Sequence, residues 1–92
     1  LQSLEASLLA LESTPGQPTL VNDVFRALHT IKGSGAMFGF DQVSEFTHHL
    51  ENLFDQIRKG LVLISPGIIS LGLKSVDFIR LLLSGTQDPQ VR

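Results

Sequence analysis

"TLVNDVFRALHTIKGSGAMFGFDQVSEFTHHLENLFDQIRKG", residues 19–60, contains two helical patterns separated by a short break. On both sides of the break, apolar residues recur three and four positions apart, which is the period of an amphipathic α-helix. The break is the triplet FGF at 38–40, and Gly60 follows the second pattern. The stretch therefore predicts two helices, at about residues 19–37 and 42–59, that fold back on each other as an antiparallel pair.

Each predicted helix has a candidate N-cap and an inward stripe. Thr19 is the expected cap of the first helix and Asp41 that of the second. The apolar residues expected to face inward are Leu20, Val21, Val24, Phe25, Leu28 and Ile31 on the first helix, and Val43, Phe46, Leu50, Leu53, Phe54 and Ile57 on the second.

The flanking segments predict two more helices. Residues 1–13 carry leucines at helical spacing, and "TPGQP" at 14–18 is typical of a loop. "LVLI" at 61–64 is interpreted as a connector whose leucines close the end of the bundle. Ser65 and Pro66 are expected to open a helix over about 66–84 that stops before Gly85, with a loose tail at 86–92. The fold class predicted for residues 1–92, as one domain, is all-α: an antiparallel up-down four-helix bundle.

Composition narrows the functional classes. The net charge is −2 with only seven Lys and Arg, which argues against a nucleic-acid partner. No apolar run reaches the roughly 20 residues of a membrane span, and no signal-peptide pattern opens the chain. Cysteine is absent, so disulfide and thiol chemistry are excluded and a cytoplasmic location is expected. Because the chain starts at Leu1 and not at Met, we expect a piece of a longer protein.

The heptapeptide HTIKGSG at 29–35 has an unusual arrangement of polar and small residues. At 100° per residue with Leu28 at zero, His29 falls at about +100°, just outside the apolar stripe. Gly33 lies one turn further on the same side, so the imidazole is expected to be open to a large partner. Lys32 projects nearer to the stripe, from where its long stem can carry the ammonium toward the outer side of the histidine.

Glu51 is the expected partner of His29. If the two helices form a hairpin, both residues lie about ten positions from the turn and are level across the helix pair. A carboxylate that accepts a hydrogen bond from one ring nitrogen fixes the tautomer and leaves the other nitrogen with a free lone pair. The spacing thus predicts an imidazole that is oriented as a nucleophile.

Residues 25–59, "FRALHTIKGSGAMFGFDQVSEFTHHLENLFDQIRK", resemble the histidine phosphotransfer (HPt) domain of chemotaxis-type histidine kinases, the CheA family. Three motifs carry the resemblance: H-x-x-K-G at 29–33, F-G-F at 38–40 and H-x-x-E at 48–51. It is weaker over the fourth helix and slight over residues 1–20. One departure is the order of small residues after Lys32, where the family often has K-G-G-A-G or K-G-S-A-G, and we expect this to change packing and not chemistry.

The resemblance implies a role for each motif residue. His29 would accept a phosphoryl group on its outer ring nitrogen, Lys32 would help to place the phosphate, and Glu51 would orient His29. His48 would have a supporting role nearby. The face around the acceptor, with Gly33, Arg26 and Ala36, is the expected docking surface.

The same resemblance implies partners. The chain contains no phosphate-binding glycine loop and no acidic pair set up to hold Mg²⁺, so no cofactor is expected in this domain. ATP and Mg²⁺ would reside on the partners, a histidine kinase catalytic domain and the receiver domain of a response regulator. The chain itself would be a phospho-accepting, monomeric module of a parent that is a histidine protein kinase.

Two other interpretations remain at this stage. The sequence HHLE at 48–51 suggests a metal site, although adjacent helical residues diverge by about 100° and do not easily share one ion with Glu51. A helical bundle that serves only as a structural or interaction module would explain the helices but not the His29–Glu51 pairing. Gly33 is interpreted as a residue that gives access to His29 or allows close helix packing, and Gly35 as one that loosens the helix end before FGF.

Overall fold

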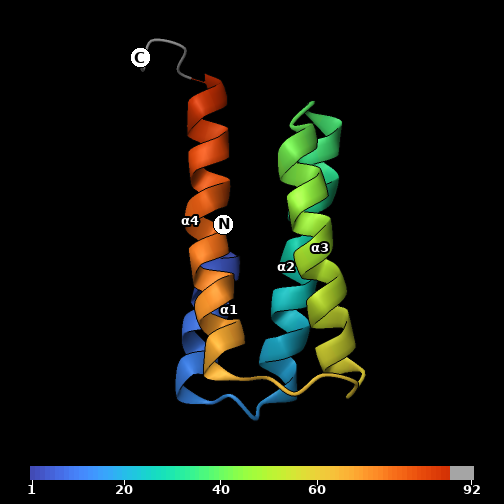
Figure 1. Ribbon diagram of the computed structural model, residues 1–92, viewed down its shortest axis with the longest axis vertical. Helices are drawn as coiled ribbons and strands as arrows, with labels where there is room; N and C mark the ends of the chain where they lie inside the picture. The colour runs from blue at the N-terminus through green and yellow to red at the C-terminus, as the bar shows by residue number, and fades with distance from the viewer. Residues whose placement is uncertain (88–92) are drawn as a thin grey trace.

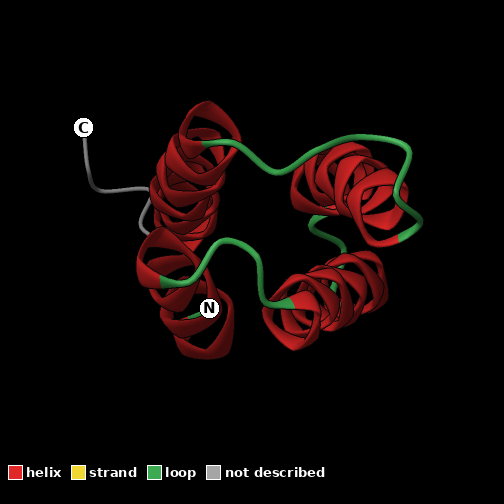
Figure 2. Cartoon of the chain, turned by 90° about the horizontal axis from the view of Figure 1, so that it is seen from below, coloured by secondary structure: helices red, strands yellow, loops and turns green. Residues whose placement is uncertain are grey.

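The computed structural model describes residues 1–87 and contains four α-helices in that range. The helices are α1 (Gln2–Ser13), α2 (Pro18–Met37), α3 (Asp41–Arg58) and α4 (Pro66–Gln87). They run alternately in opposite directions (Figure 1), and seen from one end they occupy the corners of a four-sided bundle (Figure 2). Each helix packs against its two neighbours, and no strand occurs among the described residues. The predicted all-α up-down bundle is confirmed.

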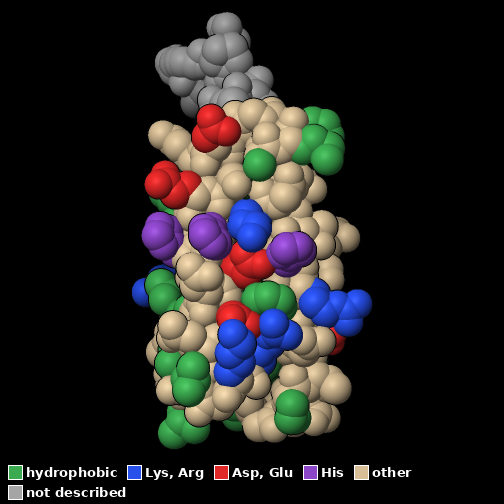
Figure 3. Space-filling model, turned by 90° about the vertical axis from the view of Figure 1, so that its right-hand side faces the viewer, with side chains coloured by type: hydrophobic (Ala, Val, Ile, Leu, Met, Phe, Trp, Pro, Cys, Tyr) green, Lys and Arg blue, Asp and Glu red, His purple; other side chains and the backbone are tan. Residues whose placement is uncertain are grey.

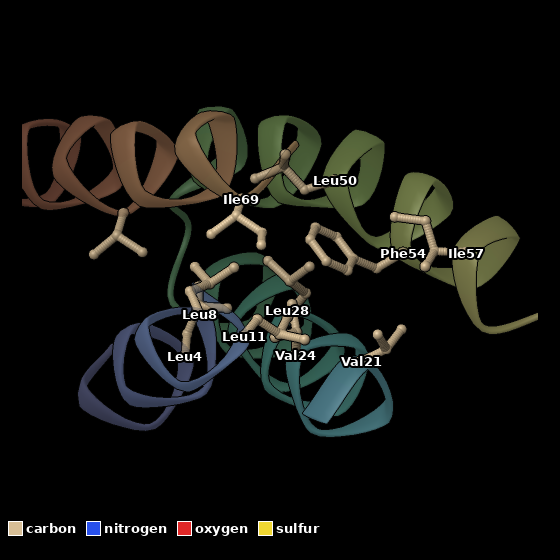
Figure 4. Packing of buried hydrophobic residues seen from close by; sticks show 11 residues of the cluster. Leu4, Leu8, Leu11, Val21, Val24, Leu28, Leu50, Phe54, Ile57 and Ile69 are labelled. Carbon is tan, nitrogen blue, oxygen red and sulfur yellow. The ribbon is translucent and has the colours of Figure 1, made fainter. Parts of the chain in front are cut away.

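The core lies along the bundle axis and is built from the inner stripes of all four helices (Figure 4). Most of the residues predicted to face inward on α2 and α3 are buried, and the others are half-buried against the cluster. The buried apolar residues are Leu4, Leu8, Leu11, Val21, Val24, Leu28, Val43, Leu50, Phe54, Ile57, Ile69, Val76 and Ile79. Burying these side chains supplies the main favourable free energy of the fold.

The helix starts differ from two of the three predictions. Helix α2 begins at Pro18, one residue before Thr19, because proline needs no N–H partner and has its φ already set for a first helical turn. Asp41 is the first residue of α3 and not its cap, and Phe40 occupies the cap position. Ser65 does cap α4, since its Oγ accepts a hydrogen bond from the Ile68 N–H at 3.2 Å.

Two glycines end helices in the left-handed region. Gly39 follows α2 with φ +82°, and Gly60 follows α3 with φ +80°. In each case the next N–H reaches back to the helix: Phe40 donates to the Gly35 carbonyl at 2.7 Å, and Leu61 donates to the Gln56 carbonyl at 2.9 Å. This is the Schellman arrangement, which a residue with a Cβ adopts only with strain. The α2–α3 turn is therefore short and fixed.

Gly35 has a packing function, so the suggestion that it loosens the end of α2 is wrong. It is buried, and a Cβ at this position would lie 3.3 Å from the Ser44 backbone nitrogen and 3.4 Å from the Phe40 carbonyl oxygen. The absence of a side chain lets the end of α2 approach the start of α3 closely.

The connector before α4 and the C-terminal end of α4 both differ from the prediction. Leu61 and Leu63 of the connector are exposed, whereas Val62 and Ile64 pack against the core, because alternate side chains of a non-helical segment point to opposite sides. Helix α4 continues through Gly85 to Gln87 and does not stop near Ser84. The rest of the tail predicted to be loose, residues 88–92, lies outside the described residues. Within residues 1–87, no helix is long and apolar enough to cross a membrane.

Candidate functional site

His29 on α2 and Glu51 on α3 meet across the helix pair. The distance from His29 Nδ1 to Glu51 Oε2 is 2.6 Å, as expected for residues that lie level on either side of the short FGF turn. The tight close of this turn sets the register of α2 against α3, so the two side chains face each other without a long loop to position them. The site thus rests on the part of the fold with the most extensive packing.

Glu51 is the buried member of the site. Its side chain is 7% exposed, and its second oxygen, Oε1, lies 2.7 Å from the ammonium of Lys32. Burial alone opposes ionisation of the carboxyl, but the hydrogen bonds from Lys32 and His29 outweigh it and hold the pKa of Glu51 below its usual value of 4.5. Glu51 is therefore ionised at neutral pH.

An ionised Glu51 determines the tautomer of His29. A carboxylate only accepts hydrogen bonds, so the Nδ1 of His29 must carry the proton and donate it to Glu51. In the neutral ring, the lone pair is then on Nε2. The side chain of His29 is 66% exposed, so one ring edge is fixed by the protein while most of the ring is open to solvent.

The surface beside His29 is open. Apart from its chain neighbours and the backbone of its own helix, nothing lies within 4 Å of the position that a Cβ on Gly33 would occupy, and Arg26 and Ala36 are exposed on the same helix. Figure 3 shows this face of the molecule, with histidine side chains at mid-height and basic and acidic side chains between and below them. The three residues predicted to form a docking surface are accessible together.

The Lys32 ammonium does not lie toward the outer side of His29, where the sequence predicts it. Its ammonium is bound to Glu51, on the inner side of the site, and its side chain is 29% exposed. The apolar stem and the buried carboxylate together explain this position, because an ammonium at the edge of the core gains most from the nearest anion. Its contribution to phosphate placement stays a prediction.

His48 is exposed on α3 and makes no hydrogen bond or ion pair with His29 or Glu51 among residues 1–87. Its ring lies next to that of His49, with centroids 6.4 Å apart and planes 24° from parallel. In the same range, no group of three His, Cys, Asp or Glu residues is arranged to hold a metal ion. The supporting role of His48 therefore also stays a prediction.

Two further residues, one beside His29 and one beyond it, were not assigned to the site from the sequence. The Phe25 ring stacks near the His29 ring, with centroids 6.4 Å apart and an interplanar angle of 22°. The guanidinium of Arg58 lies 4.0 Å from the centroid of the Phe25 ring. The spacing of four residues between Phe25 and His29 was a usable signal for the first contact. Nothing local in the sequence indicated the second, since it joins α2 to the far end of α3.

This arrangement can perform nucleophilic chemistry. It presents an imidazole nitrogen with a free lone pair to solvent, restrains the other ring nitrogen through a buried carboxylate and leaves space for a bulky electrophile. When Nε2 forms a new bond, the ring gains positive charge, and the Glu51 carboxylate at 2.6 Å stabilises that charge.

Comparisons with known proteins identify the family. The model of the family described as "Hpt domain" matches residues 1–87. Among curated proteins, the chain is 39% identical over 88 residues to the chemotaxis protein CheA of Borreliella burgdorferi, covering 96% of this chain and 10% of that protein. It is 34% identical over 87 residues to the sensor histidine kinase CheAY of Helicobacter pylori, covering 95% of this chain and 11% of that protein.

A solved structure is also similar. The CheA phosphotransferase domain from Thermotoga maritima superimposes with a TM-score of 0.76 at 34% identity, covering 90% of this chain and 80% of that chain. The chain spans about a tenth of the length of the curated relatives it matches. The chain belongs to the Hpt domain family and is homologous to the phosphotransfer domains of CheA-type chemotaxis kinases.

Proposed function

We propose that this domain carries a phosphoryl group on His29 between two protein partners. The donor is ATP bound with Mg²⁺ to a histidine kinase catalytic domain, and the acceptor is an aspartate in the receiver domain of a response regulator. The domain acts as a monomeric module in the cytoplasm, where ATP is present. The observation that carries the proposal is the contact of His29 Nδ1 with the buried Glu51 carboxylate, which leaves Nε2 free.

The first transfer joins Nε2 to the γ-phosphorus of ATP. The Nε2 lone pair forms the new N–P bond while the P–O bond to ADP breaks, and the electron pair of that bond leaves with the ADP oxygen. The Nδ1 proton stays between the ring and Glu51, where the carboxylate balances the positive charge that the imidazole acquires. Glu51 thus acts on the ring and not on the phosphate.

The second transfer reverses this bond change. An aspartate oxygen of the receiver attacks phosphorus, the N–P bond breaks, and its electron pair returns to Nε2. Lys32 helps to stabilise the phosphoryl oxygens when its ammonium, which lies 2.7 Å from Glu51 Oε1, turns outward from that carboxylate on its long stem. The open surface at Gly33, Arg26 and Ala36 is where each partner docks in turn.

The test is phosphorylation by a CheA-type kinase domain with radiolabelled ATP. Wild-type protein is expected to gain a label that is stable in base and labile in acid, as an N–P bond requires. His29→Gln is expected to gain none. His49→Gln is the matched control, since this histidine is also exposed but, among residues 1–87, makes no hydrogen bond or ion pair with Glu51, and it should keep the label. Label that persists in His29→Gln would refute the assignment.

A further inference from the structure

The hydrogen bond to Glu51 does not by itself fix the His29 ring. It restrains Nδ1, but a hydrogen bond tolerates bending, so small coupled rotations about the Cα–Cβ and Cβ–Cγ bonds can still rock the ring. The side chain is 66% exposed, so little else surrounds it. The Nε2 lone pair lies in the ring plane, and in-line attack on phosphorus depends on where that plane points. A second constraint on the plane is needed.

Phe25 provides that constraint. It precedes His29 by one helical turn on α2, and the two rings are close to parallel, with a 22° interplanar angle and centroids 6.4 Å apart. A nearly parallel, offset aromatic pair opposes tilting of either ring. Phe25 also packs against the hydrophobic core, so the bundle restrains its side chain.

Arg58 holds Phe25 from α3. Its guanidinium carbon lies 4.0 Å from the centre of the Phe25 ring, a cation–π contact, and its Nε donates to Asp55 at 2.7 Å. The other oxygen of Asp55 lies 2.9 Å from the Lys59 ammonium. Helix α3 therefore reaches His29 by two routes: directly through Glu51, and through Arg58 and then Phe25.

We propose that Phe25 is a positioning residue that sets the plane of the His29 ring, and that Arg58 keeps Phe25 in place. This inference rests on the phosphotransfer function proposed above. The alternative is that Phe25 only fills the rim of the core. The two differ in what a leucine does at position 25: it keeps the apolar packing but lacks the flat face that restrains the imidazole.

The experiment compares Phe25→Leu, Phe25→Tyr and Phe78→Leu with wild type. The matched control is Phe78→Leu, on α4. Phe78 is also a partly exposed aromatic residue in a ring pair, since the centroids of the Phe78 and Phe46 rings lie 4.9 Å apart. Phosphoramidate serves as the phosphoryl donor, since a small molecule reports the reactivity of His29 without protein docking. Thermal melts establish that each variant is folded.

Phe25→Leu is expected to lower the first-order rate of His29 phosphorylation at saturating phosphoramidate about two- to tenfold. Phe25→Tyr should restore the rate and Phe78→Leu should not change it. Arg58→Met should give a smaller loss than Phe25→Leu, in the same direction.

NMR of the His29 ring provides a readout that needs no phosphoryl transfer. In wild type, nuclear Overhauser contacts between the Phe25 and His29 rings should show one ring orientation, and in Phe25→Leu the His29 side-chain couplings should show averaging. A folded Phe25→Leu with the wild-type rate and an unaveraged His29 ring would overturn the positioning role. Failure of wild type to accept phosphate would refute the phosphotransfer function instead, while the NMR comparison would still judge Phe25.

Discussion

His29 and Glu51 are 22 residues apart in the chain, yet Nδ1 of the first lies 2.6 Å from a carboxylate oxygen of the second. The carboxylate is 7% exposed while the imidazole is 66% exposed. A buried anion thus acts on a surface nucleophile.

Replacing Glu51 by Gln should slow phosphorylation by a kinase domain about 10- to 100-fold, because the amide retains the shape but loses the charge that orients and stabilises the ring. Nitrogen NMR should show a smaller fraction of the Nδ1–H tautomer of His29. Glu45→Gln is the control, since it removes an exposed carboxylate from the same helix. Equal rates for the two variants would remove Glu51 from the mechanism.

Stability should depend on pH through Glu51. Its pKa in the folded protein is below the 4.5 of the unfolded chain, so between these values the unfolded state binds more protons. Its contribution is fully present above about pH 4.5 and is lost as the pH falls through the lower, folded value.

The measurement for this dependence is urea unfolding of wild type and Glu51→Gln from pH 7 to pH 3. The difference in the free energy of unfolding between them should shrink as the pH falls. Glu45→Gln is the matched control, because it removes an exposed carboxylate from the same helix. A gap between wild type and Glu51→Gln that widens in acid would contradict the prediction.

Lys32→Met should destabilise the fold as well as slow the transfer. The variant keeps the apolar stem but removes the ammonium that neutralises Glu51 at 2.7 Å, which should cost about 1–2 kcal/mol in the free energy of unfolding. Lys74→Met changes an exposed lysine on α4 and should have little effect. If both lysine variants unfold at the same urea concentration, the ion pair contributes nothing to stability.

Leucine at the two glycines of HTIKGSG should have opposite effects. At Gly33 there is free space around a new side chain, so Gly33→Leu should fold normally and react normally with phosphoramidate, but transfer phosphate slowly to a receiver domain. At Gly35 a Cβ already meets backbone atoms of Phe40 and Ser44 at 3.3–3.4 Å, so Gly35→Leu should lower the melting temperature. A normal transfer rate in Gly33→Leu would show that partners do not dock there.

Thr47→Val should stabilise the protein by about 1 kcal/mol, because a buried hydroxyl without a hydrogen-bond partner is costly. Thr47 is fully buried, and within residues 1–87 its Oγ1 has no such partner. Thr30→Val is the control, since this exposed hydroxyl donates to the Arg26 carbonyl at 3.1 Å and its loss should bring no gain. Chemical unfolding of the two variants gives the comparison.

The fold was predictable because the apolar period is regular in every helix, and FGF and Gly60 interrupt it clearly. The ends of the helices were less predictable than the fold. At Thr19 and Asp41 a favourable cap residue lay beside a proline or a glycine turn that set the boundary elsewhere. At Gly85 the cost of one glycine, about 1 kcal/mol, was not enough to stop α4.

In the site, the His29–Glu51 pairing was predictable from counting residues on both sides of a short turn. The inner position of Lys32 was not, because a long side chain chooses among anions that only the tertiary structure brings near. The Arg58–Phe25 contact was hidden for the same reason, since it depends on how two helices cross and on no local pattern.

The hydrogen bonds, ion pairs and ring contacts described for the imidazole and its partners all join residues between Phe25 on α2 and Lys59, which directly follows α3. Helices α1 and α4 contribute buried surface to the bundle but, within residues 1–87, no hydrogen bond, ion pair or ring contact to these groups. The sequences of α1 and α4 can therefore diverge in evolution as long as their inward-facing residues stay apolar. For protein engineering, the α2–α3 hairpin is one continuous segment that can be transferred as a unit into another helical bundle.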